Sequence, residues 1–278
     1  PPLTSSRDRG NTDGYVPAPV ATPTSAHAPP VSATYFSFKD YLSEEDATQF
    51  FELAHSAQVE KVAQYLDFLG NQPAAAQFTT SSKASISFAS SRDDSENALE
   101  WWQRRADALG LGDDESVAID STVLDTLLTG RTRSGFGAFG TEEGFLPQKQ
   151  LSLAVANIVE DIGHEYIVEC NKKGEIRSPA LNSRSFFFYW CHAEKQKILD
   201  IRQKLSKFGV NGGDPSCARL RKAYWSHVVV IVDRAMCLDC IQFAACFARS
   251  ERIYLLVEDP NMLRIFPPDR AERVEMVS

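Results

Sequence analysis

The clearest pattern of apolar and polar positions lies in the second half of this 278-residue chain, where two apolar runs each precede an amphipathic segment. Residues 185–190 read Ser-Phe-Phe-Phe-Tyr-Trp, and residues 228–232 read Val-Val-Val-Ile-Val. Aromatic and β-branched runs of this length are typical of buried strands. After each run, mostly apolar residues recur at steps of three and four positions, which is the spacing of residues on one helix face. The first face comprises Glu194, Ile198, Ile201, Leu205 and Phe208, and the second comprises Cys237, Cys240, Ala244 and Phe247.

Residues 149–278 as a whole predict a regular order of elements around these two strand-to-helix units. The predicted helices cover residues 149–162, 192–208 and 237–250. The predicted strands cover residues 164–170, a segment ending at 189 or 190, the residues around Val230, and residues 252–257. Residues 171–174, Asn-Lys-Lys-Gly, have the composition of a hairpin turn between the first two strands. The order helix, strand, strand, helix, strand, helix, strand predicts a three-layer α/β/α domain with a central mixed sheet.

The first half of the chain divides into three further regions by composition. Residues 1–34 hold seven of the 14 prolines and show no apolar periodicity, so we expect a disordered tail. Residues 35–130 predict an acidic, mainly helical region. Its helices are a long one capped by Ser43, one that includes Trp101 and Trp102, and one at 117–128. Residues 131–148 are rich in glycine and predict a connector, or a mobile loop near a site, before the domain at 149–278.

Two short motifs at the starts of the two predicted helices carry candidate chemistry. His192-Ala193-Glu194 opens the first helix, and Cys237-Leu238-Asp239-Cys240 opens the second. One imidazole and two thiolates can supply three ligands of a tetrahedral zinc ion and leave the fourth position open for water. The positive end of a helix dipole favours thiolates, and Glu194 is placed to transfer protons.

Cys191 leaves a second interpretation of the metal ligands open. It directly precedes His192, so the two could close a four-ligand structural site together with Cys237 and Cys240. Adjacent residues rarely bind one tetrahedral metal without strain, and a closed site would leave Glu194 without a role. The histidines at 55, 164 and 227 have no comparable neighbours, so we expect them to be packed or exposed.

Residues 148–266 resemble the cytidine deaminase superfamily, and most of all its DYW-type branch from organellar RNA editing factors. The residues that carry the resemblance are His192-Ala193-Glu194-Lys195, Cys237-Leu238-Asp239-Cys240, and the stretch 252–259 that leads to Phe266. The resemblance implies a hydrolase that acts on the C–N bond of a cyclic amidine and converts cytosine to uracil. It also implies one Zn²⁺ per chain held by His192, Cys237 and Cys240, with Glu194 as the catalytic acid–base. The backbone amide of Ala193 would bind the pyrimidine carbonyl.

The charge distribution bears on the substrate. The net charge of −8 divides into −11 for residues 1–148 (10 basic, 21 acidic) and +3 for residues 149–278 (19 basic, 16 acidic). Eight basic residues follow the predicted metal-binding motif: Lys195, Lys197, Arg202, Lys204, Lys207, Arg219, Arg221 and Lys222. They either attract a polyanion or form an ordinary solvated helix face. We expect a single-stranded DNA or RNA substrate. The alternatives are a deaminase of free cytidine or nucleotides and a non-catalytic deaminase-fold module with a structural zinc.

Cysteine content and hydropathy bear on the compartment. Six cysteines in a chain of this length do not suggest a disulfide framework, so we expect a reduced, intracellular protein. The sequence contains no apolar run long enough to span a membrane.

Overall fold

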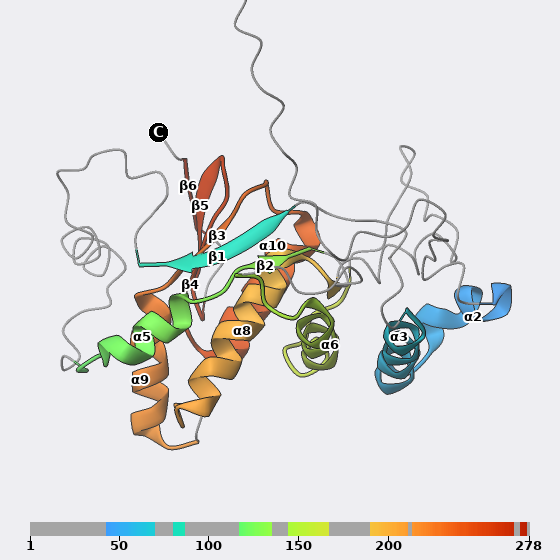
Figure 1. Cartoon of the computed structure of the whole chain (residues 1–278), viewed down its shortest axis with the longest axis horizontal. Coiled ribbons are helices and arrows are strands. Elements are labelled where there is room, and N and C mark those ends of the chain that lie inside the picture. The colour runs from blue at the N-terminus through green and yellow to red at the C-terminus, as the bar shows by residue number, and fades with distance from the viewer. Residues whose placement is uncertain are drawn as a thin grey trace, which may run out of the picture.

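The computed structural model describes residues 43–69, 80–86, 117–134, 144–166, 190–210, 213–269 and 273–276. These residues form an α/β structure around one mixed sheet (Figure 1). The predicted α/β class with a central mixed sheet, consistent with a cytidine deaminase-like fold, is confirmed. In the described part of the chain, no helix is long and apolar enough to cross a bilayer.

The sheet has six strands in the order β2-β1-β3-β4-β5-β6. Their bounds are β1 Ser81–Ser85, β2 Thr132–Arg133, β3 Val229–Val232, β4 Leu255–Glu258, β5 Met262–Phe266 and β6 Arg273–Met276. Only β3 and β4 pair in parallel, with Val230 opposite Val257, and the other neighbours are antiparallel. The parallel pair needs a long crossover between its strands, and α10 (Leu238–Glu251) provides it.

Besides α10, the helices of the described residues are α2 Glu44–Gln49, the 3₁₀ helix η1 Phe50–Glu52, α3 His55–Leu69, α5 Ser121–Leu128, α6 Gln148–Ile158, α8 Ala193–Lys207 and α9 Pro215–Ser226. Five of the described helices, α5, α6, α8, α9 and α10, pack apolar side chains against one face of this sheet. Val228, Val230 and Val232 share one core with residues of α5, α6, α8, α9 and α10. Val229 and Ile231, which alternate with them along the strand, join a smaller cluster on the opposite face.

Helix α8 is the central helix of the described structure. It crosses beneath β1 and β2 and contacts α5, α6, α10 and β3 (Figure 1). Its first nine residues are buried, including four with charged side chains: Glu194, Lys195, Lys197 and Asp200. Charged residues are almost never fully buried unless they have partners, so this helix needs specific partners for each of them.

Several predicted elements agree with the structure. The helices predicted at 149–162, 192–208 and 237–250 correspond to α6, α8 and α10, and the one at 117–128 corresponds to the shorter α5. Ser43 caps α2 as predicted, since its Oγ accepts a hydrogen bond from the Asp46 amide at 3.0 Å. The long helix predicted after Ser43 is instead interrupted at residues 50–54, which separate α2 from α3.

Other elements differ from the sequence prediction. The strand predicted at 252–257 begins only at Leu255, because Arg252 has a left-handed conformation (φ 55°) that ends α10. Helix α9 was not predicted, and β1 and β2 lie in stretches predicted as helical region and connector. The sheet therefore includes strands from before residue 149. The predicted boundaries at residues 34, 130 and 148 stay a prediction. Other predicted features lie outside the described residues. They are the tail at 1–34, the helix around Trp101, the part of the strand at 164–170 after Tyr166, and the part before Trp190 of the strand that ends at 189 or 190.

Candidate metal centre

The two predicted motifs lie at the first turns of two helices. His192 is the residue before α8, with extended backbone angles and no side-chain hydrogen bond to the helix. Cys237 is the corresponding residue of α10, and its Sγ accepts a hydrogen bond from the Cys240 amide at 3.4 Å. Both helix N-termini bring their partial positive charge to the same place, which favours anionic sulfur ligands.

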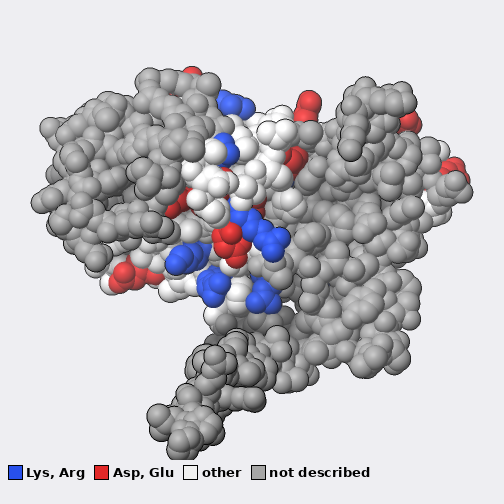
Figure 2. All heavy atoms as spheres, turned by 90° about the horizontal axis from the view of Figure 1, so that it is seen from above, with Lys and Arg blue, Asp and Glu red and all other residues white. Residues whose placement is uncertain are grey.

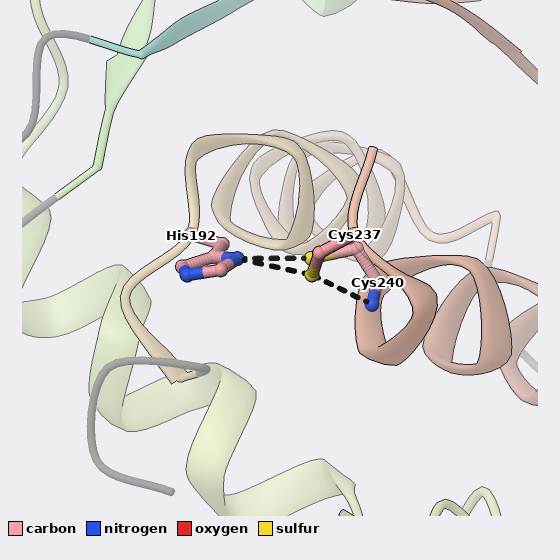
Figure 3. Close-up of side chains that lie close together, drawn as sticks. All are labelled: His192, Cys237 and Cys240. Carbon is pink, nitrogen blue, oxygen red and sulfur yellow. Dashed lines mark hydrogen bonds between the residues drawn. The ribbon is translucent and has the colours of Figure 1, made fainter. Parts of the chain in front are cut away.

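The imidazole of His192 faces both sulfur atoms across the gap between the helices (Figure 3). Its Nδ1 lies 3.2 Å from Cys240 Sγ and 3.6 Å from Cys237 Sγ. A nitrogen and a sulfur bound to one tetrahedral zinc lie about 3.6 Å apart, as follows from the usual bond lengths. The three ligand atoms lie within 4.8 Å of one another, so the donor set and its spacing fit a zinc ion.

Cys191 is not part of this group. It is fully buried, and its carbonyl oxygen accepts a hydrogen bond from Gln196 Nε2 at 2.8 Å. Within the described residues, the His, Cys and acidic side chains close enough to share a metal are His192, Cys237 and Cys240. The arrangement is therefore an incomplete tetrahedron rather than the closed four-ligand set.

The electrostatics of the site favour one thiolate beside the imidazole. The hydrogen bond from Cys240, together with the neighbouring His192, lowers the pKa of Cys237 to about 4. Burial is the main cause that raises the pKa of Cys240. Burial alone would lower the pKa of His192, but its bond with Cys237 and the charge of Glu194 raise it. Without a metal, the raised pKa values of Cys240 and His192 favour protons that a bound metal would displace, whereas Cys237 is already a thiolate near neutral pH.

Glu194 lies in the first turn of α8 and is only 4% exposed. Within the described residues its Oε2 has no hydrogen-bond partner. Buried carboxylate oxygens are normally paired, so an unpaired one beside a candidate metal centre is placed to bind a ligand or a water.

Ala193 is held by two residues that the sequence pattern did not single out. Its amide donates to Ser134 Oγ at 2.9 Å, and its carbonyl accepts from Thr132 Oγ1 at 2.7 Å. Both hydroxyl residues lie in or beside β2, within the predicted connector. A pyrimidine carbonyl that used the Ala193 amide would have to share it with Ser134, and this role of Ala193 stays a prediction.

A buried charged cluster lies next to the metal ligands. Lys195 Nζ pairs with Asp239 Oδ2, and His164 Nε2 lies 3.3 Å from Asp239 Oδ1. Burial alone would raise the pKa of Asp239, but the charge of Lys195 and the bond with His164 lower it to about 2. His164 is packed, with ring contacts to Tyr166 and Phe243, and the sequence did not indicate its neighbour Asp239.

The basic residues that follow the motif do not form one free surface patch. Lys195 and Lys197 are fully buried, so their predicted place on a solvated or polyanion-binding face is wrong. Arg202 and Arg221 pair with Glu251, and Lys204 pairs with Asp200. Figure 2 shows lysine and arginine side chains gathered on one face, with acidic side chains among them.

Comparison with known families relates one segment of the chain to a class of enzymes. Residues 131–198 match the family model described as single-strand DNA deaminase toxin A, C-terminal. With the fold, this match supports a deaminase of the nucleic-acid cytidine deaminase-like superfamily. The particular family that the chain resembles is thus the single-strand DNA deaminase toxin family, over less than half of its length. No curated protein matches the chain.

The matched segment contains one of the three candidate metal ligands. It includes β2, α6, His192 and Glu194, and it ends before Cys237 and Cys240. The fold brings the two cysteines close to His192 of the matched segment. The DYW-type branch stays a prediction that the match does not support.

Proposed function

We propose that this protein is a zinc-dependent cytosine deaminase that acts on single-stranded DNA. The observation that carries the proposal is the convergence of His192, Cys237 and Cys240 beside the buried carboxylate of Glu194. The match to a family described by single-strand DNA deamination supports the choice of substrate.

In this proposal His192 Nδ1 and the two cysteine sulfurs hold one zinc ion. When bound, zinc supplies a nucleophile at neutral pH by lowering the pKa of water. Glu194 Oε2 takes a proton from the attacking water and delivers it to the ring N3, and it then transfers the proton of the new C4 hydroxyl to the amino nitrogen at C4. Water adds at C4 and ammonia leaves, so that cytosine and water become uracil and ammonia.

The base must leave its stack to reach such a site. The ligands and Glu194 lie at helix ends among largely buried residues, where a paired base in a duplex cannot enter. A single strand presents its bases without the cost of unpairing. We therefore expect single-stranded DNA to be a better substrate than the duplex.

Two arginines and an aromatic ring next to the site support binding of a single strand. Arg131 and Arg133 lie on β2 or next to it, with their guanidinium carbons 4.9 Å and 4.1 Å from the centre of the Phe145 ring. The Arg133 carbonyl accepts a hydrogen bond from Gln196 of α8 at 3.0 Å, so this segment lies beside the first turns of that helix. Proteins commonly bind single strands with cationic side chains next to aromatic ones.

The test is deamination of one cytosine-containing sequence supplied as single-stranded DNA, duplex DNA, RNA and free cytidine, with uracil measured by mass spectrometry. We expect conversion of the single-stranded DNA, and loss of it after zinc removal with recovery when zinc is returned. Conversion of free cytidine alone would contradict the proposal that single-stranded DNA is the substrate. No conversion of any substrate by the zinc-loaded protein would overturn the activity.

A binding measurement tests the arginines separately. Arg131→Ala and Arg133→Ala should weaken single-stranded DNA binding in fluorescence anisotropy, with the larger effect at low salt. Arg202→Ala is the control, because Arg202 pairs with Glu251. An equal loss in all three variants would show that only overall charge matters.

A further inference from the structure

The pair formed by Lys195 and Asp239 connects the two motifs that hold the metal ligands. Lys195 is the third residue of α8, and Asp239 is the second residue of α10, between the two cysteines. Their side chains meet in a buried ion pair across the gap between the helices, with Lys195 fully buried and Asp239 2% exposed. Each partner therefore belongs to the helical turn that carries a metal ligand.

Both carboxylate oxygens of Asp239 lie close to a nitrogen atom. Oδ2 accepts from Lys195, and Oδ1 faces His164 Nε2 at 3.3 Å. The Lys195 ammonium also lies 5.3 Å from the centre of the Tyr166 ring and 5.2 Å from that of Phe243, so rings surround it. These contacts leave the carboxylate and the ammonium little freedom to move.

General stability does not explain a lysine at this position. A cation near a helix N-terminus is opposed by the helix dipole, and its burial has a large desolvation cost. Well-packed apolar residues often replace a buried ion pair with no loss of stability, and Tyr166 and Phe243 already provide an apolar surround. A feature that opposes local preferences in this way indicates a functional constraint.

We infer that Lys195 and Asp239 are a positioning pair that fixes the relative placement of the two helix ends, so that His192, Cys237 and Cys240 meet one metal ion. A metal site requires its ligands to be held within about 0.5 Å of the bonding geometry. His192 comes from one helix and both cysteines from the other, and the pair is a direct bond between those two turns. The inference deepens the proposed function, since it concerns the same metal site, but metal affinity can be measured without turnover.

A second buried pair in the same helix is a matched control. Lys197 is also fully buried, and its Nζ lies 2.8 Å from Asp200 Oδ2. Lys197 donates to the carbonyl oxygens of Leu127, Thr129 and Gly130 at the end of α5, and the Asp200 carboxylate also pairs with Lys204. This pair therefore stabilises the contact between α5 and α8, away from α10.

The experiment measures zinc affinity by competition with a colorimetric chelator, and stability by thermal unfolding, in the full chain. Lys195→Met and Asp239→Asn should raise the zinc Kd about 10- to 100-fold, the size of loss found when residues that orient metal ligands are removed. The double variant Lys195→Met/Asp239→Asn leaves no unpaired buried charge, so its stability should recover toward wild type while its zinc Kd stays raised. Lys197→Met/Asp200→Asn should lower the melting temperature and leave the zinc Kd within about twofold of wild type.

The outcomes separate this inference from the proposed function. A double variant that binds zinc as tightly as wild type overturns the positioning role. Equal changes of the zinc Kd after substitution of either pair would also overturn the positioning role, because the effect would then reflect stability alone. If a single variant does not fold, the zinc Kd of the double variant Lys195→Met/Asp239→Asn tests the positioning role. A wild-type protein that binds no zinc overturns the proposed function itself.

Discussion

The amide nitrogen of Ala193 lies 2.9 Å from Ser134 Oγ, although 59 residues separate the two along the chain. This bond joins the segment that follows β2 to the first turn of α8, beside His192 and Glu194. It also satisfies one of the helix amides that lack a partner within the helix itself. The first turn of the metal-binding helix is thus completed by a residue from the glycine-rich segment before it.

Removal of this hydroxyl should destabilise the protein. Ser134→Ala leaves the buried Ala193 amide without its acceptor, which costs about 1–3 kcal/mol. Urea unfolding should show a loss of this size. Ser134→Thr retains the hydroxyl and should unfold closer to wild type, whereas equal losses in both variants would show that the bond contributes little.

Glu194→Gln should separate catalysis from metal binding. The side chain is not among the three convergent ligands, so zinc content and melting temperature should remain near wild type. Loss of a general acid–base group lowers the rate about a hundredfold to ten-thousandfold. Uracil formation in single-stranded DNA measures the effect, and Glu160→Gln, at an exposed position, is the control. Full activity of Glu194→Gln would contradict the proposed chemistry.

Substitution of the ligands should remove the metal. His192→Ala, Cys237→Ser and Cys240→Ser each take away one of three donors, and the purified variants should contain far less zinc than wild type by elemental analysis. Cys191→Ser should retain about one zinc per chain, since Cys191 lies outside the convergent group. Zinc loss in Cys191→Ser would favour the closed structural site.

Lys197 should make stability depend on pH in the alkaline range. Burial is the largest cause that lowers the pKa of Lys197, from an ordinary value of 10.5 to about 8, and it outweighs the attraction of Asp200. Between about pH 8 and 10.5 the unfolded chain holds a proton on this amine that the folded chain has lost. Stability therefore rises with pH across this range, by at most about 3 kcal/mol for this group.

The comparison of wild type with Lys197→Met isolates that contribution. Unfolding free energies from urea titrations at pH 7.5 and pH 10 should differ between the two proteins by an amount that grows in favour of wild type as pH rises. A difference independent of pH would mean that Lys197 keeps its proton in the folded protein at pH 10.

Local patterns predicted the parts of the fold whose periodicity is visible in the sequence. Helices α8 and α10 carry regular apolar steps, and β3 is a run of valine and isoleucine, so each was predicted close to its observed position. The ligand set was predicted because its residue types and spacing have a direct chemical meaning. Its convergence to within 4.8 Å needed the fold, because no local pattern specifies how two helix ends meet.

The elements that sequence reasoning missed depend on distant partners. Strand β1 reads Ser-Ser-Lys-Ala-Ser and β2 only Thr-Arg, and neither shows the apolar alternation of a strand. Pairing with β3 stabilises β1, with Ala84 opposite Val230. Lys195 was interpreted as a surface cation because lysine is rarely buried, and its partner Asp239 is 44 residues away.

The separation of the ligands along the chain also bears on when during synthesis the protein can act. His192 and Glu194 precede β3, whereas Cys237 and Cys240 follow it. A chain whose translation stops between Glu194 and Cys240 carries the proposed catalytic carboxylate without a full set of the candidate metal ligands. If the protein is the proposed deaminase, such truncated chains cannot alter a base, because the full ligand set is complete only after the crossover from β3 has been made.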